Sequence, residues 1–196
     1  MPAEPQVEAP PQARQLADNR AAYASFAVAF LLGHGSFAVS QGPHPYLTLP
    51  GWLPYLLLAA GVIPGVVLSF RATRHLRSSS DAGEAWGERM LGTSWATVFI
   101  ALALAITGLA STLDAQEAQV VMWPAGAVGV VGMINIAEGV ARRNQLHYAL
   151  GSWLVLVAGA ALLLPTPGPF WVLALAGGLG YVAAIPLEGR RLQRAE

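Results

Sequence analysis

The chain has 196 residues, of which 55% are hydrophobic and only 11% are charged. A soluble domain usually carries about 25% charged residues, so this composition excludes an ordinary water-soluble domain and indicates a chain whose solvent is largely lipid. The formal net charge is zero, and no basic stripe interleaves with aromatic residues, so we expect no nucleic-acid partner.

The first predicted segment, residues 1–21, is a disordered cytoplasmic tail. It contains four prolines among scattered Glu, Gln and Arg residues, and it lacks the apolar core of a signal peptide. Such a segment cannot bury enough apolar surface to offset the entropy lost on folding. Residues 191–196 are predicted to form a second, shorter cytoplasmic tail.

Six apolar segments lie between the two tails, and each is long enough to cross a bilayer as a helix, which takes roughly 20 residues. None shows the period-2 alternation of barrel strands, and a helix satisfies its own backbone groups in lipid. We therefore predict an all-α membrane protein, with a six-helix transmembrane bundle in residues 22–190. The spans are expected at 23–40, 52–70, 96–113, 120–140, 148–164 and 170–187.

The even-numbered spans share one spacing of tryptophan, glycine and arginine. The spacing W-x8-G-x9-R covers about 28 Å of helix, close to the roughly 30 Å thickness of the hydrocarbon core. Two interpretations stay open: anchoring residues that any span would show, or a helical hairpin repeated three times. The three sets are Trp52–Gly61–Arg71, Trp123–Gly132–Arg142 and Trp171–Gly180–Arg190.

The arginines predict the orientation. All 11 basic residues are arginines, and all precede the first span, follow the last, or lie between spans 2 and 3 or spans 4 and 5. The three opposite loops contain none. The positive-inside rule then places both termini in the cytoplasm and the chain in the cell membrane as a multi-pass protein.

Small residues on the even-numbered spans are the predicted helix-packing positions. Apolar helices associate in lipid through close packing, which small side chains permit. The competing explanation is that these residues only reflect a small-residue composition. The positions are Gly61 and Gly65 in span 2, Gly126, Gly129 and Gly132 in span 4, and Ala176, Gly180 and Ala184 in span 6.

Prolines and one long loop carry further local predictions. Pro64 and Pro186 should bend or loosen their helices, as packing devices or, at Pro64, for gating. Within the loop 71–89, the run SDAGEAWGER resembles a short interfacial helix, with Trp86 in the headgroup layer.

Polar residues in or beside the spans are the candidate functional groups. Glu138 and Glu188 precede Arg142 and Arg191 at helical spacing, so interfacial salt bridges are one interpretation. The other is a polar pocket that opens to the cytoplasm, with an acid/base role for the histidine. Its predicted members are Asn135, Glu138, His147, Tyr148 and Glu188.

His34 lies alone in span 1, between two glycines, in the run LLGHGSF. It could bind a ligand or relay a proton, or simply bond to a neighbouring helix. The four histidines have no metal-ligand spacing, the chain has no cysteine, and the familiar nucleotide, hydrolase and magnesium motifs are absent, so we expect neither a metal nor a cofactor.

The sequence therefore leaves three functions open. The first is a small transporter or a permease-like membrane subunit, favoured by the packing residues. The second is an accessory membrane protein without turnover, acting as a homo-oligomer or with a partner subunit in the lipid bilayer. The third is a membrane-embedded enzyme acting on a lipid or isoprenoid-like substrate, with Glu138, His147 and Glu188 as its candidate groups.

Overall fold

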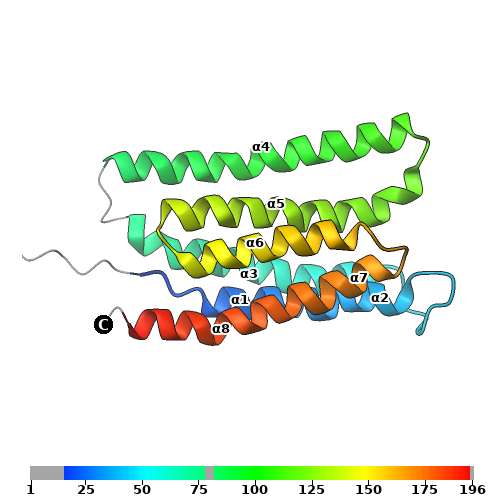
Figure 1. Cartoon of the computed structure of the whole chain (residues 1–196), viewed down its shortest axis with the longest axis horizontal. Helices are drawn as coiled ribbons and strands as arrows, with labels where there is room; N and C mark the ends of the chain where they lie inside the picture. Colours follow the sequence, from blue (N-terminus) through cyan, green and yellow to red (C-terminus); the bar gives the residue numbers. More distant parts are fainter. Residues whose placement is uncertain (1–15, 78–81, 195–196) are drawn as a thin grey trace, which may run out of the picture.

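The computed structural model describes residues 16–77 and 82–194, and this part of the chain is helical, without strands. Long helices lie side by side (Figure 1). The first runs from Arg20 to Ser40 and comprises α1 (Arg20–Val28), the π-helix η1 (Ala29–His34) and α2 (Gly35–Ser40). After it come α3 (Leu53–Arg77), α4 (Ala82–Thr112), the 3₁₀ turn η2 (Gln116–Ala118), α5 (Gln119–Ala141) and α6 (Gln145–Ala161). The last long helix comprises α7 (Gly168–Val172), the π-helix η3 (Leu173–Gly177) and α8 (Gly178–Gln193).

Each of the six predicted apolar segments corresponds to one of these long helices, so for the described residues the all-α prediction with six helices is confirmed. The fifth segment, predicted to end at residue 164, ends as a helix at Ala161. Five of the helices are long and apolar enough to span a membrane. The exception is α6, whose 17 residues extend about 25 Å at the usual helical rise.

Several boundaries differ from those predicted. The first helix begins at Arg20, inside the predicted tail 1–21, and α8 continues to Gln193, inside the predicted tail 191–196. The remainder of the N-terminal tail, residues 1–15, lies outside the described residues. The predicted interfacial helix around Trp86 is the start of α4, since one continuous helix extends from Ala82 to Thr112.

The main helix contacts follow one series, with α3 and α4 as its first and last members. The first helix contacts α3 on one side and α8 on the other, α8 contacts α6, α6 packs along α5, and α5 contacts α4. Figure 1 shows α4 along one edge of the bundle. The main buried core joins α1, α5, α6 and α8, and includes Phe30, Val128, Leu154 and Tyr181.

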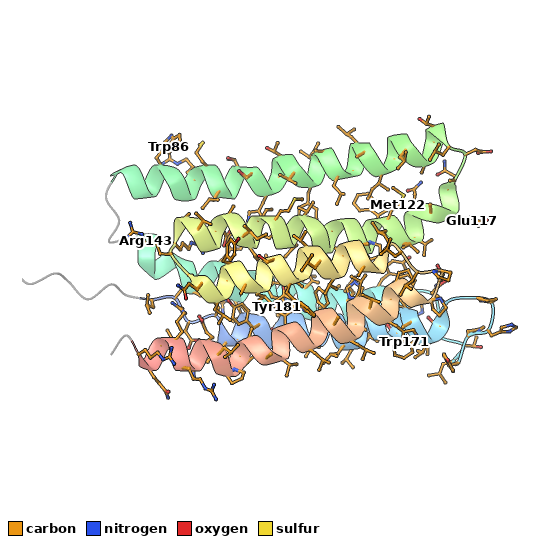
Figure 2. The ribbon with its side chains drawn as sticks, in the orientation of Figure 1. Trp86, Glu117, Met122, Arg143, Trp171 and Tyr181 are labelled. Atoms are coloured by element: carbon orange, nitrogen blue, oxygen red, sulfur yellow. The ribbon has the colours of Figure 1, made fainter. Side chains whose placement is uncertain are left out.

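The described ends of the chain lie at the same end of the bundle as the turn between α5 and α6 (Figure 1). Arg143 is in this turn, and Figure 2 shows it opposite Trp171 and Glu117, which lie at the other end. We call the end with Arg143 the arginine end.

Glycines set the closest helix contacts. Gly61 on α3 lies against the backbone of Ala29, and Gly132 on α5 faces Gly151 on α6 so closely that a Cβ on either would meet the other's carbonyl oxygen. Gly180 on α8 lies against the indole of Trp153. The three neighbours are not equivalent in a repeat of hairpins made of spans 1–2, 3–4 and 5–6. Gly61 and Gly180 contact the other helix of their own hairpin, whereas Gly132 contacts a helix of the next hairpin. The threefold hairpin repeat stays a prediction.

The other predicted packing positions have separate neighbours. Gly65 lies against the ring of Phe26, and Gly126 against Leu102 on α4. A Cβ at Gly129 would be in ordinary contact with Ala158, at 3.5 Å. Ala176 is half-buried in η3, and Ala184 is buried in the core.

Two π-helical segments face each other in the first and last long helices. η1 and η3 are in contact, and a Cβ at Gly177 or Gly178 would overlap Phe30 or Leu31. Pro64 and Pro186 lie inside α3 and α8, outside the π-helical segments, and the bends predicted at these prolines stay predictions. π-helical turns are rare and often occur at functional sites.

Candidate functional site

A short turn brings Glu138 and His147 together at the arginine end. α5 ends at Ala141, Arg143 adopts a left-handed conformation with φ +52°, and α6 begins at Gln145. The side chain of Asn144 caps α6 by accepting a hydrogen bond from the His147 backbone N–H at 3.1 Å. The glutamate near the end of α5 therefore faces the histidine in the first turn of α6.

Three side chains form a connected series across the bundle. The hydroxyl of Tyr23 on α1 lies 3.0 Å from Nδ1 of His147, although the two residues are 124 positions apart in the chain. Nε2 of the same ring lies 3.4 Å from Oε2 of Glu138, an ion-pair distance without hydrogen-bond geometry. The imidazole thus lies between a phenol and a carboxylate, and we call Tyr23, His147 and Glu138 the central triad.

Two further side chains hold the carboxylate of the central triad. The indole N–H of Trp95 on α4 donates to Oε1 of Glu138 at 3.3 Å. A guanidinium nitrogen of Arg142 lies 3.2 Å from Oε2. This charged neighbour compensates part of the cost of burying the carboxylate, and the tryptophan links the outlying α4 to the centre of the bundle.

Glu188 has partners of its own. Its side chain is fully buried, with 0% exposed, and Arg191 holds both carboxylate oxygens at 2.7 Å. Asn19 donates to Oε1 from its backbone N–H and from its side-chain amide, each at 3.2 Å. Arg191 also donates to the carbonyl of Ala17 at 2.7 Å, so the segment before α1 is bound to α8.

One ion pair lies at the outer margin of the Glu188 cluster. Hydrogen bonds from the Arg20 guanidinium to Asp18, the shortest at 2.7 Å, hold the pKa of that carboxyl below its usual value. Asp18 is therefore ionised at neutral pH and adds a negative charge beside Arg191.

Asn135 and Tyr181 lie deeper in the bundle. Both are buried, and the Asn135 amide lies near the Tyr181 hydroxyl. The Tyr181 ring contacts Tyr23, with ring centroids 6.1 Å apart. Asn135 thus reaches the central triad through ring packing of two tyrosines and has no direct polar contact with the triad among the described residues.

The residues predicted to line one pocket therefore divide between two polar clusters, and Asn135 and Tyr148 belong to neither. Glu138 and His147 belong to the central triad, whereas Glu188 belongs to a separate cluster with Asn19 and Arg191. Tyr148 is half-exposed, and its backbone packs on Gly139. Tyr23, Trp95, Asn19 and Tyr181 were not predicted. One feature of the sequence could have pointed to Tyr23: it follows Arg20 by about one helical turn, which places it at the depth of His147.

His34 lies apart from these clusters, at the end of η1. Only 3% of the residue is exposed, its ring packs on Phe30 at 4.9 Å, and Nδ1 is buried without a hydrogen-bond partner. Beside it, the hydroxyl of Ser36 donates to the carbonyl of Gly33 at 2.7 Å. The π-helix therefore orients a lone imidazole into the contact between the first and last long helices.

An apolar groove lies on the outside of the bundle, between α6 and α8. Its volume is about 410 Å³, and its lining is apolar throughout. Leu146 and Leu187 lie at the arginine end of this α6–α8 groove. Each directly precedes a member of a polar cluster in the chain: Leu146 precedes His147, and Leu187 precedes Glu188.

Within the described residues, no group of three or more His, Asp or Glu side chains is placed to hold a metal ion. No known protein family, curated protein or solved structure matches the chain. The arrangement of its own residues is therefore the basis for a functional proposal.

Proposed function

We propose that this chain is a multi-pass integral protein of the cell membrane, with its arginine end in the cytoplasm, and that it works as a small proton-coupled transporter or as the permease-like subunit of a membrane assembly. Five helices have the length and hydropathy of membrane spans. The distribution of arginines supports the orientation.

The exposed faces of α3 and α4 support the membrane placement. Large apolar side chains cover them, including Ile63, Ile100 and Leu104, the last with 70% of its surface exposed. Soluble monomers rarely expose contiguous apolar surface on this scale, whereas lipid tails solvate it well.

The observation that carries the transport function is the central triad. An imidazole between a phenol and a carboxylate can accept a proton from one side and release it to the other, and His is the residue that changes charge most readily near neutral pH. Ionisable groups buried among membrane helices usually mark an ion or substrate path. Proton uptake at the triad would change the charge between α1, α5 and α6, and so could couple to a movement of these helices.

Purified protein in liposomes loaded with a pH-sensitive dye tests this proposal. Pools of amino acids, sugars, organic cations and inorganic ions are added outside, and a solute-dependent change of internal pH is expected. Glu138→Gln should abolish the signal, while Glu117→Gln, an exposed acidic residue at the other end of the bundle, should preserve it. A permease-like subunit would instead show no flux alone and would purify with a stoichiometric membrane partner. Absence of both results would refute the proposal.

A second function, an enzyme acting on a lipid or isoprenoid-like substrate, is favoured by one observation. The α6–α8 groove ends at Leu146 and Leu187, which directly precede His147 and Glu188 in the chain, so the polar end of an apolar substrate in the groove would lie at the same depth as these acid/base groups. Incubation of the reconstituted protein with isotopically labelled membrane lipids tests it. New products that disappear in His147→Gln would support the enzyme over the transporter.

A further inference from the structure

The α6–α8 groove has the dimensions of a lipid-chain site. Its lining on α8 runs from Ala176 to Leu187, and the stretch from Gly180, where the Trp153 indole lies, to Leu187 is about 10 Å along the helix axis. One leaflet of a bilayer contributes about 15 Å of hydrocarbon, half of the roughly 30 Å total. A chain lying in the groove would therefore be held over about two thirds of the depth of one leaflet.

Small residues create the groove, and one aromatic residue closes it. Ala183 on α8 and Ala149 on α6 leave the space between the helices unfilled, whereas the space beside Gly180 is occupied by the Trp153 indole. At the inner end of the groove, the indole N–H of Trp153 donates to the carbonyl of Ala176 at 2.9 Å, while its ring lies against Gly180. The indole is thus held across the groove and forms its end wall.

Positive charge lies at the opposite end of the groove. Arg190 follows Leu187 by three residues on α8, so it continues the helix face that lines the groove. It is exposed and has no acidic partner in the described part of the chain, in contrast to Arg191, which Glu188 holds. α6 also begins at the arginine end, at Gln145, where the helix macrodipole adds partial positive charge.

We propose that the α6–α8 groove binds one acyl chain of an anionic phospholipid from the leaflet on the arginine side, and that Arg190 binds its phosphate group. The complementarity is twofold: an apolar groove between α6 and α8, and beyond Leu187 an exposed guanidinium that has no acidic partner among the described residues. The site depends on the membrane placement proposed above but not on transport, and it gives α6, the shortest of the long helices, a fixed lipid neighbour.

Native mass spectrometry of the delipidated protein, titrated with phosphatidylglycerol or phosphatidylcholine, tests the site. One tightly bound phosphatidylglycerol is expected, with weaker binding of phosphatidylcholine. Arg190→Gln should weaken phosphatidylglycerol binding about fivefold, the usual effect of one arginine at an anionic surface. Arg71→Gln, at the exposed end of α3, is the matched control and should bind as the wild type does. The proposal would be contradicted if both variants bound phosphatidylglycerol equally weakly, or if neither bound it more weakly than the wild type.

The apolar part of the site needs a separate measurement. Ala183→Phe should fill the groove and abolish the tight binding, whereas Ala105→Phe, on the exposed face of α4, should not. If Ala183→Phe does not fold, phosphatidylglycerol with a photoreactive group on its acyl chain replaces it. Crosslinks are expected in residues 146–153 and 176–187, and an even distribution over α3 and α4 would exclude the groove as a site. Cysteine labelling of the topology identifies the separate case in which the membrane placement itself fails.

Discussion

His147 contacts polar groups from two other helices, the phenol of Tyr23 and the carboxylate of Glu138. A ring nitrogen buried at this depth has no access to water, so the Tyr23 hydroxyl satisfies Nδ1, which would otherwise be costly to bury, whereas Nε2 has only the ion-pair distance to Glu138. The same groups that could exchange a proton therefore also hold α1 against the turn between α5 and α6.

Removing the hydroxyl of Tyr23 should reveal the structural part of this role. We expect Tyr23→Phe to lower the free energy of unfolding by roughly 1–3 kcal/mol, because Nδ1 of His147 would remain buried without its partner. Thermal unfolding in detergent, followed by circular dichroism, measures the change. Tyr46→Phe, at a hydroxyl on an exposed loop, should leave stability as it is; an equal loss in both variants would argue against a contribution from the Tyr23–His147 contact.

Glu188 offers a stronger test at the scale of one residue. Glu188→Ala should destabilise the protein by on the order of 3 kcal/mol, because Arg191 would keep a partly buried charge without its counter-ion. The segment 16–19 should also detach from α8, since Asn19 loses its acceptor, and limited proteolysis should then cleave near Asp18. Glu117→Ala, on an exposed residue, is the control. Unchanged proteolysis in Glu188→Ala would show that the cluster does not hold the N-terminal segment.

At the scale of the helices, close contact at glycine decides which neighbours pair. Gly132 and Gly151 bring the backbones of α5 and α6 together, and this helix pair is the most extensively packed of the bundle. By contrast, Gly108 on α4 has open space around it. The sequence alone does not distinguish a glycine in a close helix contact from a glycine in open space.

A matched pair of alanine substitutions distinguishes these two environments. In Gly132→Ala the new Cβ would lie 2.8 Å from the carbonyl oxygen of Gly151, so we expect the free energy of unfolding to fall by about 1–3 kcal/mol. In Gly108→Ala the Cβ meets nothing, and the higher helix propensity of alanine should raise stability by up to about 1 kcal/mol. Chemical denaturation in mixed micelles measures both, and changes of the same sign would contradict the packing at Gly132.

At the scale of the whole molecule, the bundle has a central group of helices and two outlying ones. α1, α5, α6 and α8 share the main core, whereas α3 and α4 expose most of their surface. An outlying helix can face lipid or a second protein without any rearrangement of the core. A homo-oligomer or a partner subunit would therefore be accommodated most easily along α3 or α4.

The absence of cysteine allows a direct test of orientation. Single cysteines replacing His44 and Glu117, both on exposed loops away from the arginine end, should react with an impermeant thiol reagent on intact cells. A cysteine replacing Gln145, at the arginine end, should react only after the cells are opened. Labelling of all three from outside, or recovery of the chain in buffer without detergent, would refute the proposed membrane placement.

The sequence by itself determined the features that depend on neighbouring residues. Six apolar runs predicted six helices, the arginines marked one end of the bundle, and the i,i+3 and i,i+4 spacings brought Arg142 and Arg191 to their glutamates. Spacing along one helix is enough for such pairs. The pairing of Glu138 with His147 was also within reach, because the two residues flank a short turn.

Only the tertiary structure decided which helices are neighbours and which polar groups meet. Tyr23 reaches His147 from the far end of the chain, Glu188 is buried apart from the central triad, and two π-helices face each other where no proline indicated them. The physical reason is that a helix face turned to lipid and a face turned to another helix are equally apolar, since lipid tails are as apolar as leucine side chains. Composition and spacing cannot separate the two faces. Which helices become neighbours therefore depends on shape complementarity at positions such as Gly61 and Gly132.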